Sequence, residues 1–201
     1  MNSRRSFLVN ISMKVSGLAI GSDPVATRAV AESSSPLDEW TKQLGNPRVV
    51  FDVADIRSPD SLTVIRRVLD GYRSVISLSP PKLGVVVVVR RQAVAMLVDS
   101  QVWRQYDIPE GVLGLDVSSG WKMRNPFFDA LATVQRRGAV ILGCQLALNE
   151  LLIQIAKKRQ TDREELIKVI TSTLLPGAIM LPNGLFGLAR AQNVGCALVR
   201  N

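Results

Sequence analysis

Leu83-Gly84-Val85-Val86-Val87-Val88-Val89-Arg90 contains five consecutive valines and no polar residue before Arg90. A strand with one face in water alternates apolar and polar side chains, whereas a strand that is covered on both faces does not. The run is too short to cross a membrane as a helix. It therefore predicts a strand at 83–89 in a parallel sheet that helices cover on both faces.

Further strands and helices alternate along the chain on either side of this run. Short apolar or β-branched runs predict strands, and apolar residues at helical spacing predict helices. Strands are expected at 48–53, 83–89, 139–142, 178–181 and 196–199, and helices at 62–78, 93–98, 126–137, 145–157, 161–174 and 183–192. This alternation predicts an α/β fold with three layers (α/β/α) and a mostly parallel sheet of about five strands with right-handed crossovers.

Several helix starts carry capping signals. Asn125 before Pro126 has the pattern of an N-cap followed by an N1 proline, and Ser58-Pro59-Asp60 has the same pattern before the first long helix. Thr161 with Glu164 is typical of a capping box.

The stretch 103–124 is rich in glycine and polar residues and is interpreted as a substantial loop, which is often functional in a compact domain. Trp103, Tyr106, Trp121 and Asn125 border it. They are expected either to form a lid or subunit contact or to pack in the core.

Ligands in open α/β folds bind at the carboxyl ends of the strands. The candidate substrate-binding residues are therefore Arg90, Arg91 and Gln92 after the second strand, Gln145 after the third and Asn183 after the fourth. The alternative for the two arginines is a strand end that emerges into solvent.

The absence of histidine from the 201 residues excludes several enzyme classes. Ser-His-Asp triads, Cys-His pairs and metal sites that need imidazole all require it. No GxGxxG, Walker, GxSxG or paired-carboxylate pattern is present either. We therefore expect no metal site and no cofactor.

The two cysteines differ in their surroundings. Cys144 follows a predicted strand and precedes a predicted helix, where the helix dipole and free amides favour a thiolate, so it is the candidate catalytic residue. The alternative is a buried cysteine that fills an apolar gap. Cys196 is expected to be structural. A third possibility is a structural Cys144–Cys196 disulfide.

The N-terminus has the features of an export signal. Ser3-Arg4-Arg5-Ser6-Phe7-Leu8 matches the twin-arginine pattern, a modestly apolar stretch follows, and Ala29-Val30-Ala31 is typical of a cleavage site. We expect a signal peptide at 1–31, a linker with a short helix at 32–46 and one domain at 47–201, located in the periplasm or otherwise exported. The alternatives are a basic tail and an uncleaved anchor. No membrane span is expected after removal of the signal.

The formal net charge of +8 is shared between this leader and short basic pairs in the rest of the chain. These pairs lack the aromatic residues that single-strand nucleic-acid binders place between basic residues, so no nucleic-acid partner is expected. Arg90 and Arg91 form the pair at which a small anionic ligand is the candidate partner.

The order of three stretches resembles the DsrE/DsrF-like family, which has the YchN-like fold. They are the valine run, Arg137-Gly138-Ala139-Val140-Ile141-Leu142-Gly143-Cys144 and Leu174-Leu175-Pro176-Gly177. Asn125-Pro126-Phe127 and Ala189-Arg190-Ala191-Gln192-Asn193-Val194-Gly195-Cys196 are similar to phrases of an exported branch with twin-arginine leaders.

This resemblance implies a fold, a role for one cysteine and an assembly. In the sulfur-relay members a cysteine after the same strand carries a persulfide, and Cys144 is the matching position. Those members are oligomers, so the resemblance implies that this chain forms a homo-oligomer. Many relatives have a histidine after the second strand, where this chain has Arg90 and Arg91.

Two functions are therefore expected as alternatives. The first is a thiol-based sulfur-transfer or redox protein that uses Cys144 and takes a small anionic or sulfur-containing ligand. The second is a non-catalytic domain for small-molecule binding or oligomeric assembly.

Overall fold

The computed structural model describes residues 36–56, 61–116 and 119–199, which belong to the unit Ser34–Asn201. The predicted signal segment and the Ser58-Pro59-Asp60 cap lie outside the described residues. In chain order the elements are η1 (Pro36–Gln43), β1 (Arg48–Val53), α1 (Ser61–Ile76), β2 (Gly84–Val89), η2 (Arg91–Leu97), α2 (Ser100–Gln105), η3 (Ile108–Val112), α3 (Ser119–Met123), α4 (Pro126–Arg136), β3 (Val140–Cys144), α5 (Gln145–Arg159), α6 (Arg163–Thr173), β4 (Ile179–Leu181), α7 (Gly184–Asn193) and β5 (Ala197–Val199).

The strands form one parallel sheet with the order β4-β3-β2-β1-β5. Strand β2 occupies the centre, and all six of its residues are buried. In the register Val89 lies between Val53 of β1 and Gly143 of β3. The uninterrupted valine run is explained by this position, because a central strand has no face in water. The predicted parallel sheet of five strands is confirmed.

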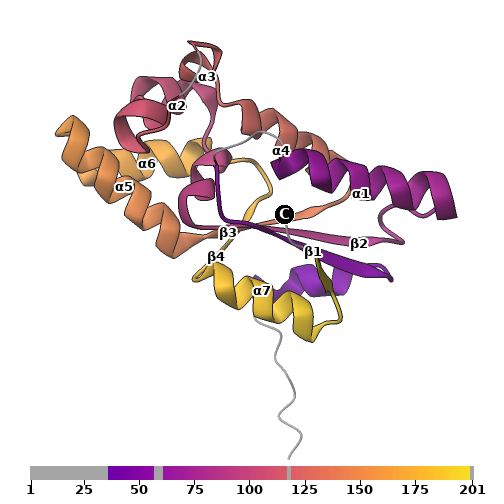
Figure 1. Ribbon diagram of the computed structural model, residues 1–201. Helices are drawn as coiled ribbons and strands as arrows, with labels where there is room; N and C mark the ends of the chain where they lie inside the picture. Colours follow the sequence, from indigo (N-terminus) through magenta and orange to yellow (C-terminus); the bar gives the residue numbers. More distant parts are fainter. Residues whose placement is uncertain (1–35, 57–60, 117–118, 200–201) are drawn as a thin grey trace, which may run out of the picture. The chain divides into compact units, whose positions relative to one another are not determined.

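Helices cover both faces of the sheet, which gives the predicted three layers (Figure 1). The large cluster on one face joins α1, α4 and α5 to Val85, Val87 and Val89 of β2. The smaller cluster on the other face packs Trp40 and Leu44 beside Leu188 and Ala191 of α7 against Val86 and Val88. Strands β4 and β5 lie at opposite edges of the sheet, and α7 connects them. This helix lies on the face opposite α1, α4 and α5.

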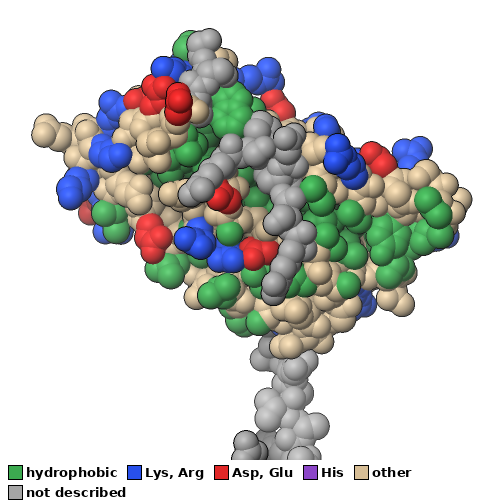
Figure 2. Space-filling view, viewed as in Figure 1, with side chains coloured by type: hydrophobic (Ala, Val, Ile, Leu, Met, Phe, Trp, Pro, Cys, Tyr) green, Lys and Arg blue, Asp and Glu red, His purple; other side chains and the backbone are tan. Residues whose placement is uncertain are grey.

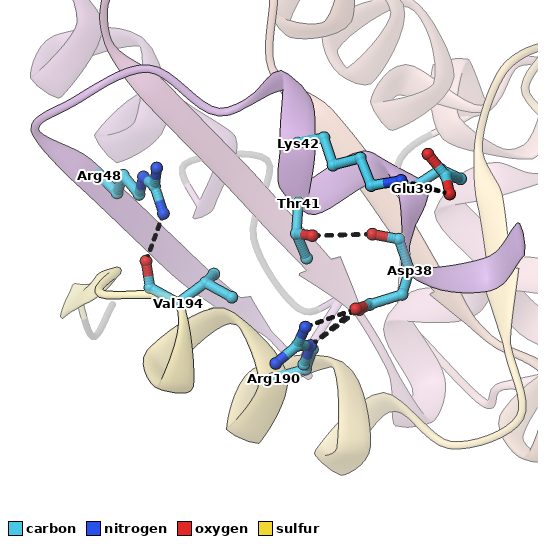
Figure 3. A network of polar contacts seen from close by, with 7 residues as sticks. All are labelled: Asp38, Glu39, Thr41, Lys42, Arg48, Arg190 and Val194. Carbon is cyan, nitrogen blue, oxygen red and sulfur yellow. Dashed lines mark hydrogen bonds and ion pairs between the residues drawn. The ribbon is translucent and has the colours of Figure 1, made fainter. Parts of the chain in front are cut away.

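The segment expected as a linker with a short helix contributes to this second layer. Asp38 of η1 accepts a two-pronged hydrogen bond from Arg190 of α7, with N–O distances between 2.5 and 3.0 Å (Figure 3). Arg48 of β1 donates to the carbonyl of Val194 at 2.5 Å. The bonds from Arg190 and the burial of Trp40 attach η1 to the folded unit, and the bond from Arg48 joins β1 to the end of α7.

The Asp38–Arg190 pair predicts a pH-dependent contribution to stability. The hydrogen bonds from Arg190 lower the pKa of Asp38. A lowered folded-state pKa gives stabilisation that is complete above the ordinary aspartate pKa and is lost as the pH falls through the folded value. Asp38→Asn is expected to lower the free energy of unfolding at neutral pH by about 1 kcal/mol.

Urea unfolding of both proteins over a range of pH tests this expectation. The difference between wild type and Asp38→Asn should shrink as the solution becomes more acidic than the ordinary aspartate range. A difference that stays constant into acid would mean that the ionised pair does not carry the effect.

The prediction of a long loop at 103–124 is wrong. Helix α2 covers the start of this stretch, η3 forms a π-type turn, and α3 follows. Trp103 is fully buried, and its Nε1–H donates to the carbonyl of Trp121 at 2.6 Å. The aromatic residues of this segment therefore pack into the core, where Trp121 also stacks edge-on against Phe127.

Two of the predicted helix caps can be compared with the structure. Asn125 caps α4 as predicted, and its Oδ1 accepts the N–H of Phe127 at 3.0 Å. The capping box at Thr161 is wrong by one residue, because Asp162 is the N-cap of α6 and accepts the N–H of Glu165 at 2.9 Å. Asp162 replaces Thr161 as the residue whose side-chain oxygen caps the helix, so the capped amide is that of Glu165 and not that of Glu164.

Among the described residues, no helix has the length and apolar character that a membrane crossing requires.

Candidate functional site

Three elements converge at the carboxyl edge of the sheet. Arg90 follows β2, Cys144 ends β3, and Gly184 begins α7. A Cβ atom built on Gly184 would lie 2.7 Å from Cβ of Arg90 and 3.2 Å from Cβ of Cys144. These distances are shorter than normal contacts between carbon atoms. Only glycine lets the first turn of α7 approach both residues this closely.

Arg90 is held in one orientation by Asp52 of β1. Its Nε and Nη2 atoms each donate to a different carboxylate oxygen of Asp52, both at 2.7 Å. This hydrogen bonding raises the pKa of Arg90, and burial opposes the increase. Both side chains are about four-fifths buried, so the pair is better protected from solvent screening than a surface ion pair.

Cys144 is the N-cap residue of the 15-residue helix α5. Its Sγ accepts the backbone N–H of Ala147 at 3.4 Å. The residue is 6% exposed, so it is less accessible than a fully open nucleophile. The sequence prediction that Cys144 lies between a strand and a helix start is confirmed. Its sulfur accepts an amide hydrogen bond and lies at the positive end of the helix dipole.

Gln145 and Asn183 flank this edge but are engaged in local structure. Gln145 donates from Nε2 to Oδ1 of Asn149 at 3.2 Å. Asn183 caps α7, and its Oδ1 accepts the N–H of Leu185 at 2.8 Å. Both residues therefore position the ends of α5 and α7.

Arg91 and Gln92 lie on a different side of the strand end from Arg90. They line a hollow of about 210 Å³, together with Glu150 and Gln154 of α5. Arg91 has a φ of 53°, in the left-handed region that non-glycine residues seldom adopt. The six residues predicted for the site thus fall into two neighbouring groups, one around Cys144 and one around this hollow.

Sequence reasoning missed Asp52 and did not anticipate the close approach of Gly184. Asp52 had a recognisable signal, because it is a carboxylate in the otherwise apolar stretch 49–53 of a strand predicted to be covered. Gly184 had none, since its role depends on where α7 docks.

The proposed disulfide is incompatible with the fold. Both cysteines are free and buried. Cys144 lies at the carboxyl end of β3, whereas Cys196 precedes β5, and β2 and β1 separate these two strands. Three strand spacings amount to about 14 Å, and a disulfide requires Cα atoms within about 7 Å. Burial raises the pKa of the Cys196 thiol, which suits a structural residue.

Figure 2 shows Lys and Arg side chains next to Asp and Glu side chains over the region where the strands end and α5 begins. No group of three or more metal-binding side chains occurs within 36–56, 61–116 and 119–199.

Comparisons with known proteins give little beyond this geometry. No family model and no curated protein matches the chain. Among solved structures, the chain is similar to the protein of unknown function MTH1491 from Methanobacterium thermoautotrophicum, with 15% identity, a TM-score of 0.43 and coverage of 77% of this chain and 98% of that one. The assignment to the three-layer α/β class rests on the topology of the sheet described above.

Proposed function

We propose that this chain is an exported thiol protein of the DsrE/DsrF-like type, in which Cys144 accepts a sulfur atom and passes it on. The observation that supports this function best is the placement of Cys144 at the strand end. Its Sγ accepts an amide N–H of α5, and the Cβ atoms of Cys144 and Arg90 both lie close to the first residue of α7. Amides, a helix dipole and a guanidinium all stabilise negative charge on sulfur.

The reaction needs no histidine and no metal. Sγ of Cys144 attacks the terminal sulfur of an organic persulfide, R–S–SH. The S–S bond of the donor breaks, a new S–S bond joins the terminal sulfur to Cys144, and the electron pair leaves on R–S⁻. The proton that Cys144 loses is taken up by this leaving thiolate, so the products are the Cys144 persulfide and R–SH.

Arg90 is the second functional residue in this scheme. Its two hydrogen bonds to Asp52 fix the guanidinium at the strand end, where it lines the edge of the sheet that the donor approaches. Asp52 is a positioning residue that acts through Arg90.

A sulfur-loading experiment tests the function. The full chain is incubated with cysteine persulfide, and its intact mass is measured before and after reduction. Wild type and Cys196→Ser should each gain the mass of one sulfur atom, which the reductant removes, while Cys144→Ser gains none. Cys196→Ser is a matched control, because both cysteines are equally buried but Cys196 lies at the opposite end of the sheet.

Equal loading of the two variants, or loading only after denaturation, would contradict the proposal.

The low exposure of Cys144 and the separate hollow favour a second candidate function, in which the domain binds a small molecule without a thiol reaction. In that case Cys144→Ser should bind the molecule as well as wild type does.

A further inference from the structure

The hollow beside the candidate site combines opposite charges with an apolar floor. Arg91 and Glu150 lie on its rim with Gln92 and Gln154, and Val94 and Leu151 contribute apolar surface. Within the described residues neither Arg91 nor Glu150 takes part in an ion pair. Arg90, by contrast, is already committed to Asp52. The hollow therefore offers one cation and one carboxylate that are not paired with any other described residue.

We infer that this hollow binds a small amino-acid-type molecule that carries both a carboxylate and an ammonium group. Arg91 binds the carboxylate through its planar donors, and Glu150 binds the ammonium group. The amides of Gln92 and Gln154 supply further donors and acceptors. This inference rests on the proposed function in one respect, because it takes the bound molecule to be the carrier part of the persulfide donor.

The size of the hollow limits the ligand. Its volume is about 210 Å³, whereas sites for drug-sized ligands measure about 300–1,000 Å³. A single amino acid or a similar molecule of few heavy atoms matches this volume. A nucleotide or dinucleotide does not, in agreement with the lack of phosphate-binding motifs in the sequence.

The hollow is connected to the reacting sulfur through one residue. Ala147 lines the hollow, and its N–H is the group that donates to Sγ of Cys144. Ala147 therefore lies between the hollow that contains Arg91 and Glu150 and the sulfur of Cys144. An amino acid with a persulfide on its side chain has its charged groups at one end and its transferable sulfur at the other, which suits this arrangement.

The backbone at Arg91 separates the two arginines. Arg90 has an extended backbone and directs its side chain toward Asp52 and α7, and Arg91 then adopts its left-handed conformation as η2 begins. Such a conformation is costly for a residue with a side chain and is retained where the surrounding structure fixes it. As a result, Arg90 belongs to the group around Cys144, and the adjacent Arg91 lines the hollow.

Equilibrium binding to the full chain tests the inference with a molecule that cannot transfer sulfur. The probe is S-methylcysteine, measured by titration calorimetry, with its methyl ester and its N-acetyl derivative as analogues that lack one charge. Wild type should bind S-methylcysteine and should bind each analogue about tenfold more weakly or worse. Arg91→Gln should lose the preference for the free carboxylate, and Glu150→Gln should lose the preference for the free ammonium group.

Arg66→Gln on α1 and Glu164→Gln on α6 are matched controls, because both residues are exposed and lie outside the hollow. Each should bind S-methylcysteine as wild type does. The absence of binding, or equal weakening by the control variants, overturns the inference.

Sulfur loading of Cys144 separates this failure from failure of the proposed function. Loading at equal rates from charged and uncharged persulfides, unaffected by Arg91→Gln and Glu150→Gln, would overturn the inference and leave the function intact. Binding of S-methylcysteine that depends on both residues, without loading of Cys144, would support the binding site and reject the sulfur-transfer role.

Discussion

Replacing Asn125 with alanine is expected to lower the free energy of unfolding by about 3–5 kcal/mol. Asn125 is fully buried. Its Nδ2 donates to the carbonyls of Ala95, Met96 and Val98 at 3.2, 3.2 and 2.6 Å, while its Oδ1 caps α4. Alanine removes the cap and leaves buried carbonyls without a donor, and both losses occur where water cannot replace the side chain.

Asn125→Asp separates the two contributions. The aspartate keeps an acceptor for the N–H of Phe127 but places a carboxylate against the three carbonyl oxygens. Urea unfolding should show at least as large a destabilisation as for Asn125→Ala. If Asn125→Asp is instead close to wild type in stability, the cap carries the effect and the bonds to η2 contribute little.

Asn125 also shows where sequence reasoning succeeds and where it ends. The Asn-Pro pair predicts the N-cap of α4, because a cap depends on residues that are adjacent in the chain. The bonds to η2 and its C-cap join residues 27 to 30 positions apart, and no local pattern records them. The same limit explains the error at 103–124, where the hydrogen bond from Trp103 to Trp121 and the burial of the indole stabilise short helices in a stretch of loop-like composition.

The sheet was more predictable than the site. Apart from β1, which contains Arg48 and Asp52, each strand is a short apolar run. A run without polar alternation requires cover on both faces, so the layers follow from the sequence pattern. The place of Arg90 and Cys144 also follows, because parallel strands end at one edge. The division between Arg90 and Arg91 does not follow, since it depends on the φ of Arg91 and on the ion pair between Arg90 and Asp52.

Replacing Gly184 with alanine is expected to lower the rate of sulfur loading at Cys144 by about 10- to 100-fold and the free energy of unfolding by about 1–3 kcal/mol. The new Cβ would lie 2.7 Å from Cβ of Arg90 and 3.2 Å from Cβ of Cys144. These are atoms near the backbone rather than flexible side-chain ends, so the clash moves α7 away from the strand ends. The start of α7 then no longer packs against Arg90 and Cys144.

Gly71→Ala is the matched control for this change. Gly71 lies within α1, and a Cβ built there meets no atom within 4 Å. Its replacement should raise the free energy of unfolding by about 0.5–1 kcal/mol, because alanine favours the helix, and should leave the loading rate unchanged. Rapid-quench loading and urea unfolding of both variants give the comparison. If the interpretation is correct, Gly184→Ala should not load sulfur and unfold as wild type does. Wild-type behaviour of this variant would show that the function does not depend on the close approach of Gly184 to Arg90 and Cys144.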